Sequence, residues 1–118
     1  MDIILEELSR NMPASTTENL TYYISTAGND NNDGLTTDTS FATIAKALSM
    51  LPQIIDHTIM IYIANGEYNE DVNISDYVGV GSIGIIGDTS RPRNVILSSI
   101  TISNCYCNIK ISGVKLIK

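Results

Sequence analysis

Short apolar segments, separated by glycine, asparagine or serine, fill the second half of this chain and constrain its fold more than any other feature. The segments are 58–64, 72–74, 82–86, 95–97, 100–102, 105–107, 109–111 and 114–116. None has a helical period, and several alternate apolar with polar residues as a half-exposed strand does. Ile61, Ile85 and Ile109 are spaced by 24 residues, a length typical of one repeat of a stacked solenoid. The sequence therefore predicts a mainly β fold in which these three isoleucines form one apolar column.

The apolar pattern changes phase at Asn104. Ile100 and Ile102 occupy even positions, whereas the apolar residues that follow, beginning with Cys105 and Cys107, occupy odd positions. A phase change marks a bend between strands, and asparagine tolerates the backbone angles that a bend requires. Residues i and i+2 of a strand point to the same face and rarely form a disulfide. We therefore predict a bend at Asn104 and two cysteines that act as small buried side chains.

The preceding stretch predicts a strand at 22–24, a turn at 27–34 and one amphipathic helix over 40–51. Thr39 or Ser40 is the expected N-cap, and Pro52 is the expected stop. The apolar stripe of this helix consists of Phe41, Ile44, Leu48 and Leu51. Because segment 58–64 is apolar on both faces, we expect a helix or a neighbouring chain to cover its second face.

The turn at 27–34 is rich in asparagine and aspartate. Its pattern Asn-x-Asn-x-Asp-Gly at 29–34 matches the first half of an EF-hand loop, but the twelfth position is Ser40 rather than glutamate. Asp30, Asp33 and Asp38 are therefore candidate ligands of a different calcium site. The alternative, which we favour, is a solvated turn that holds no cofactor.

The first eighteen residues read as a separate segment, an amphipathic helix followed by a polar linker, with the β domain covering 19–118. Ile4, Leu5 and Leu8 recur at helical spacing and are the candidate assembly residues. Two uses stay open for this segment. It docks on its own domain as a cap, or it binds a partner protein or the equivalent segments of sister subunits.

Charge is unevenly distributed along a chain whose net charge is −6. All 13 acidic residues lie between Asp2 and Asp88, where only Arg10 and Lys46 are basic. Residues 91–118 contain five basic residues and no acid. The acidic front argues against a nucleic-acid partner. The basic rear is suited to the acidic front of a neighbouring copy, although charges on solvated strand faces are the simpler interpretation.

Two further classes are disfavoured by the sequence. No run of about 18 apolar residues is present, which argues against membrane insertion. The N-terminus lacks the basic region and the cleavage site of a signal peptide, so an extracellular role would require release within a particle.

Few residues suggest catalysis, and we predict that the chain is not an enzyme. His57 lies in a connection between apolar segments and reads as a surface residue. Glu67, Glu70 and Asp71 form a local carboxylate cluster, which is more typical of a solvated turn than of a glycosidase pair. Four tyrosines are candidates for stacking on sugars, for core packing or for a subunit interface, namely Tyr62, Tyr68, Tyr77 and Tyr106.

The stretch 22–66, with the pattern Gly-x-Tyr-x-Glu-x-Val-x-Ile at 66–74, resembles the first segment of the right-handed parallel β-helix proteins of the pectate-lyase-like superfamily. That superfamily includes phage tail spikes, tail appendages and polysaccharide lyases, and the resemblance extends from residue 22 to the C-terminus. It implies a short right-handed parallel β-helix of about three rungs, in which the helix over 40–51 covers the N-terminal end of the core. The catalytic motifs of the superfamily have no counterpart here residue by residue.

The apolar pattern stops in mid-rung over 113–118 without a polar cap, so we expect another chain or further protein to cover that end. The function implied by the resemblance is structural. The chain is expected to be part of a phage-type tail or baseplate, as the attachment portion of a spike, fibre or appendage in host adsorption. The expected assembly is a homotrimer, located in the virion, made in the host cytoplasm and bound to other tail proteins, with cell-surface polysaccharide as a further partner. The alternatives are the N-terminal part of a polysaccharide lyase or hydrolase and a non-catalytic carbohydrate-binding module.

Overall fold

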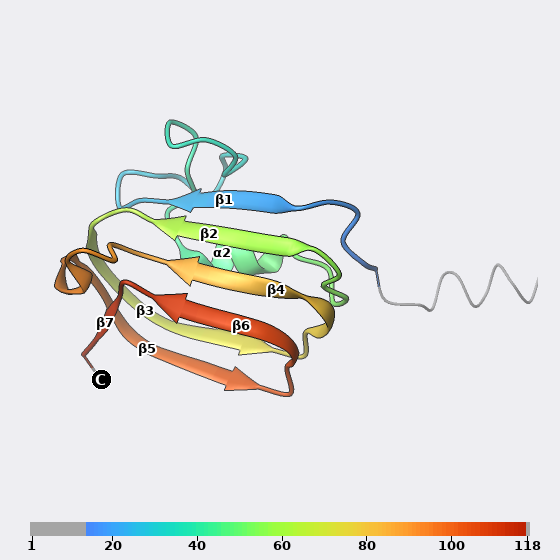
Figure 1. Ribbon diagram of the computed structural model, residues 1–118. Helices are drawn as coiled ribbons and strands as arrows, with labels where there is room; N and C mark the ends of the chain where they lie inside the picture. The colour runs from blue at the N-terminus through green and yellow to red at the C-terminus, as the bar shows by residue number, and fades with distance from the viewer. Residues whose placement is uncertain (1–13, 118) are drawn as a thin grey trace, which may run out of the picture.

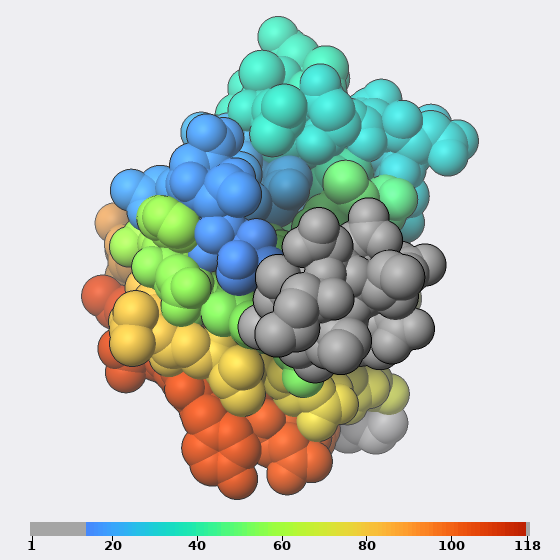
Figure 2. Space-filling model, turned by 90° about the vertical axis from the view of Figure 1, so that its right-hand side faces the viewer, coloured from blue at the N-terminus to red at the C-terminus, as the bar shows by residue number. Residues whose placement is uncertain are grey.

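The computed structural model describes residues 14–117, which form two parallel sheets that face each other (Figure 1). Sheet A contains, side by side, β1 (Leu20–Ile24), β2 (Thr58–Ile63), β4 (Val78–Ile86) and β6 (Tyr106–Ser112). Sheet B contains β3 (Gly66–Ser75), β5 (Val95–Ser103) and β7 (Lys115–Leu116) in that order. From β2 onward the chain passes alternately between the two sheets, so successive layers follow the sequence, from blue to red in Figure 2. The expectation of a mainly β chain with parallel sheets is confirmed.

The one α-helix among these residues, α2 (Ile44–Ser49), is shorter than the predicted helix over 40–51. Its N-cap is Thr43, whose side chain accepts a hydrogen bond from the backbone of Lys46, and not Thr39 or Ser40. The helix starts late because Phe41 is extended beside β1 and exchanges backbone hydrogen bonds with Tyr23 and Ser25. The predicted apolar stripe is nevertheless buried throughout.

The core lies between the sheets and is built from columns of paired, inward-facing residues. One column contains Tyr22, Ile61, Ile85 and Ile111, and the next contains Leu20, Ile59, Ile83 and Ile109. The predicted pairing of Ile61 with Ile85 is therefore confirmed. The predicted position of Ile109 is wrong, because Ile109 lies beside Ile83 rather than Ile85.

The physical reason for this shift lies in the connections. The loop between β4 and β5 contains an additional short 3₁₀ helix, η1 (Pro92–Asn94), which lengthens this connection. β4 also has a register irregularity between Val78 and Ser82. Gly79 within it has φ 132°, and a Cβ at this position would lie 2.1 Å from the carbonyl oxygen of Ile55. A glycine is therefore required where β4 passes the preceding turn.

The chain itself covers the first edge of each sheet. The free edge of β1 pairs with the returning loop, through the N–H of Tyr23 to the carbonyl of Gly34 and the N–H of Phe41 to the carbonyl of Tyr23. The free edge of β3 lies next to α2. This end of the stack is thus protected against pairing with other chains.

Two further predictions concern the bend at Asn104 and the outer face of β2. Asn104 has φ 52°, which confirms the predicted bend between β5 and β6. The outer face of β2 carries Met60 and Tyr62, and α2 lies on the opposite, inner side of sheet A (Figure 1). Tyr62 is 39% exposed, so within the described residues no helix covers the outer face of β2.

The linker is tied to the sheets where the description begins. Ser15 forms an isolated parallel bridge with Ile54, which in turn bridges Val78. Thr16 is buried, and its hydroxyl hydrogen-bonds to the Nδ1 atom of His57 at 2.7 Å. Residues from Ala14 onward therefore belong to the same structural unit as the sheets.

Two valines, in the successive strands β3 and β4, provide a matched test of this packing. Val72 in β3 is 1% exposed and faces the core, whereas Val80 in β4 is 87% exposed. The substitution Val72→Ala removes two buried carbon atoms and should lower the free energy of unfolding by about 2 kcal/mol, including the cavity that remains. The substitution Val80→Ala should change it by less than about 0.5 kcal/mol. Urea denaturation of both variants measures this difference, and equal losses would contradict the assigned faces.

Candidate functional site

The three candidate calcium ligands have separate roles in the structure. Asp30 turns toward the start of α2, where its Oδ1 atom accepts hydrogen bonds from the N–H groups of Ala42 and Thr43 at 2.9 and 3.1 Å. Its Oδ2 atom accepts a hydrogen bond from the Thr43 hydroxyl at 2.9 Å. Asp30 therefore fastens the loop to the helix, a role that residue spacing alone did not indicate.

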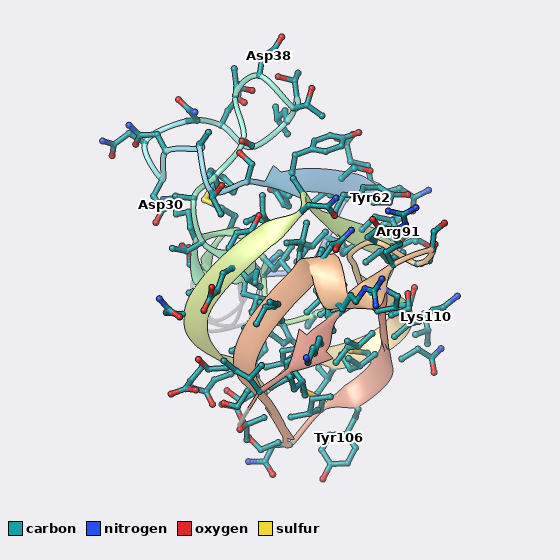
Figure 3. All side chains as sticks on the ribbon, turned by 90° about the vertical axis from the view of Figure 1, so that its left-hand side faces the viewer. Asp30, Asp38, Tyr62, Arg91, Tyr106 and Lys110 are labelled. Carbon is teal, nitrogen blue, oxygen red and sulfur yellow. The ribbon has the colours of Figure 1, made fainter. Side chains whose placement is uncertain are left out.

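Asp33 and Asp38 belong to the loop that projects beyond β1. The Oδ1 atom of Asp33 accepts hydrogen bonds from the N–H of Leu35 and the hydroxyl of Thr39, and these bonds lower the pKa of Asp33. Asp38 lies at the far tip of the loop, well away from Asp30 (Figure 3). Within residues 14–117, no group of three or more histidine, cysteine, aspartate or glutamate side chains is arranged to hold a metal ion.

The carboxylates that the sequence grouped as a cluster in β3 also have separate hydrogen-bond partners. Glu70 accepts hydrogen bonds from the N–H groups of Ile44 at 3.1 Å and Ala45 at 2.7 Å, which are the first two residues of α2. A β-bulge between Tyr68 and Asp71 places Glu70 in this position. Asp71 accepts a hydrogen bond from the hydroxyl of Ser99 at 2.7 Å. Glu70 thus has a structural role at the positive end of a helix.

The four candidate tyrosines separate into two groups. The hydroxyl of Tyr68 donates to the carbonyl of Ala64, and that of Tyr77 donates to the carbonyl of Leu48, both at 2.8 Å. Burial raises the pKa of Tyr68 to about 12 and also raises that of Tyr77. These two tyrosines pack inside the molecule, and only Tyr62 and Tyr106 remain available to a ligand or a partner.

Tyr62 contributes to a hollow on the outer face of sheet A. Its ring stacks on that of Tyr23, with centroids 5.8 Å apart and planes inclined by 22°. The hollow has a volume of about 310 Å³, and Ile86, Thr37 and Ser40 also line it. It therefore combines an aromatic platform with hydroxyl groups, which is the chemistry that binds the faces and edges of a sugar.

The other end of the stack differs from the first, because nothing in the described part of the chain pairs with the outer edges of β6 and β7. We call this region the open end, and define it as β6, β7 and the last layer of core residues. That layer consists of Ile100, Ile102, Cys105, Cys107, Ile109, Ile111 and Val114. Tyr106, which is 77% exposed, projects from the open end (Figure 3).

At the open end, the last member of each column is less buried than the member before it. Ile59 and Ile83 are fully buried, whereas Ile109, the last member of their column, is half-buried. In sheet B, Ile74 is fully buried but its paired neighbour Ile102 is 47% exposed. These side chains face the core and are exposed because no further layer of residues 14–117 covers them. The two cysteines follow the same trend, since both are free and half-buried instead of buried as predicted.

The predicted assembly residues Ile4, Leu5 and Leu8 lie outside the described residues. No helix within residues 14–117 has the length and apolar character needed to cross a membrane. No family model, curated protein or solved structure matches this chain.

The role assigned to Glu70 predicts the effect of its removal. The substitution Glu70→Ala leaves the N–H groups of Ile44 and Ala45 without their acceptor and should lower the free energy of unfolding by about 1 to 2 kcal/mol. Glu67, an exposed acid three residues earlier in β3, provides the control, because Glu67→Ala should have little effect. Chemical denaturation at neutral pH measures both. An unchanged stability of Glu70→Ala would contradict the capping role.

Proposed function

We propose that this chain is a structural component of a phage-type tail or baseplate, in which it forms a short right-handed parallel β-helix. The proposal is supported by the strict alternation of the chain between two parallel sheets and by the stacking of paired isoleucines in register. The position of α2 beside the first strand of sheet B suits a helix that covers one end of such a core.

A single observation carries the structural function, namely the contrast between the two ends. The first end is closed by α2 and the returning loop, whereas the open end presents unpaired strand edges and half-buried core residues. An exposed apolar layer with free strand edges favours association with other protein. The open end therefore functions as an assembly surface, and the expected assembly is a homotrimer within the particle.

The enzyme alternative, an N-terminal part of a polysaccharide lyase or hydrolase, receives little support from the carboxylates. Glycosidic hydrolysis needs a pair of carboxyl groups that face a substrate. Asp30 and Glu70 instead accept hydrogen bonds from the backbone around the start of α2, and Asp71 accepts one from Ser99. We therefore retain a non-catalytic role.

A second candidate function is carbohydrate binding at the hollow beside Tyr62. The stacked tyrosine pair favours it, because aromatic faces that are exposed to solvent bind the apolar faces of sugar rings. Binding of cell-surface polysaccharide is compatible with a role in host adsorption, since the hollow lies on the outer face of sheet A and the open end lies elsewhere.

The assembly proposal predicts the mass of the protein in solution. Light scattering on a sizing column should give three copies of the full chain at micromolar concentration. The substitution Ile102→Lys, which places a charge in the open end, should reduce the assembled fraction. Val80→Lys, at an exposed valine of β4, should not. A monomer at all concentrations would overturn the proposal.

The carbohydrate proposal predicts binding to a panel of bacterial surface oligosaccharides, measured by saturation-transfer NMR. Tyr62→Ala should abolish the transfer signal, because it removes the exposed ring of the stacked pair. Tyr106→Ala removes an even more exposed ring at the open end and should leave the signal unchanged. Absence of binding by the unmodified chain, or equal effects of the two substitutions, would exclude the hollow as a sugar site.

A further inference from the structure

The open end carries positive charge as well as apolar surface. Lys110 in β6 and Lys115 in β7 are exposed, so each of the two sheets ends in a strand with a free lysine side chain at its surface. The sequence contains no acidic residue after Asp88. A partner that fits this surface must therefore combine apolar residues with negative charge.

The chain itself contains one segment of this chemistry. Residues 1–13 include Ile3, Ile4, Leu5 and Leu8 together with Asp2, Glu6 and Glu7. At helical spacing Ile4, Leu5 and Leu8 fall on one face, with Asp2 and Glu7 at its two sides. Arg10 is the only basic side chain in this segment.

The length of the tether indicates which copy of the chain provides the segment. Ser15 is fixed at the first end of the stack, in a row that continues through Ile54 and Val78 to Tyr106. Three strand spacings separate Ser15 from Tyr106, about 14 Å, and a helix that covers the last layer lies about 10 Å further. A fully extended chain needs about seven residues for this path, so on the same copy Leu8 would be part of the tether and could not dock. The tether length therefore favours docking on a second copy.

We propose that residues 1–13 of one copy dock on the open end of a second copy. The inference rests on the assembly proposed above and deepens it by naming the segment that fills the assembly surface. The apolar face of the segment covers the half-buried layer that includes Ile102 and Ile109. Asp2 and Glu7, at the two sides of that face, lie near Lys110 and Lys115. Because this contact joins two different surfaces, a rotation that closes produces a ring, and a ring of three copies agrees with a trimer.

Reversal of the charges tests this contact with the full chain. Variant one carries Lys110→Glu and Lys115→Glu, and variant two carries Asp2→Lys and Glu7→Lys. Each variant alone should associate at least about tenfold more weakly, since both charges at the contact become repulsive. A control with Asp38→Lys and Glu67→Lys makes the same charge change as variant two at exposed positions far from the open end, and should assemble like the unmodified chain.

Mixing distinguishes exchange between copies from other arrangements. In an equimolar mixture, each segment finds an open end of opposite charge on the other variant. The mixture should therefore form assemblies that contain both variants and are heavier than either variant alone in sedimentation analysis. A variant with all four substitutions restores opposite charges and should recover the mass of the unmodified chain, which also shows that the substituted chain folds.

Three results would overturn the inference. If both variants assemble like the unmodified chain, the segment does not bind the open end, although the assembly proposal stands. If the variants are monomers whose mixture forms no assembly that contains both, the contact is not an exchange between copies. If the unmodified chain is itself monomeric, the assembly proposal fails and this inference fails with it.

Discussion

The stability of a stack of parallel strands depends above all on what pairs with the strand edges and covers the apolar side chains at its two ends. Within the stack, each strand satisfies the backbone of the next and each isoleucine packs on its paired neighbour, as Ile61 does on Ile85. At an end, the same geometry exposes a row of N–H and carbonyl groups together with a layer of apolar side chains. The contrast between the closed end and the open end in this molecule follows directly from that constraint.

The closed end is held by two carboxylates that come from distant parts of the sequence. Asp30 from the loop and Glu70 from β3 together accept the N–H groups of residues 42–45 around the start of α2. A helix as short as α2 is marginal alone, and most of its stability must come from this capping and from its buried face. Both acids thus have a structural role at the start of this helix.

Sequence reasoning predicted the features that depend on local apolar periodicity. It failed for the features that contacts between distant residues determine. The mainly β character, the bend at Asn104 and the burial of Phe41 and Leu48 follow from local pattern and were predicted correctly. The parallel arrangement of the strands was implied by the resemblance and not by the pattern. The position of Ile109 depends on connection lengths, and the start of α2 depends on the pairing of Phe41 with β1. The role of Glu70 depends on a bulge and on a helix about twenty-five residues earlier. Periodicity contains no information on such contacts.

Charge provides the remaining link between the fold and its proposed assembly. Hydrophobic burial alone would let the open end pair with any exposed strand edge, since that interaction lacks direction. Lysines on the last strand of each sheet disfavour pairing of one open end with another, because like charges would then face each other. They favour an acidic partner, and the segment before Ala14 is acidic and amphipathic. In the proposed assembly, the uneven charge of the chain would oppose contact between two open ends and favour contact between an open end and the acidic segment of another copy.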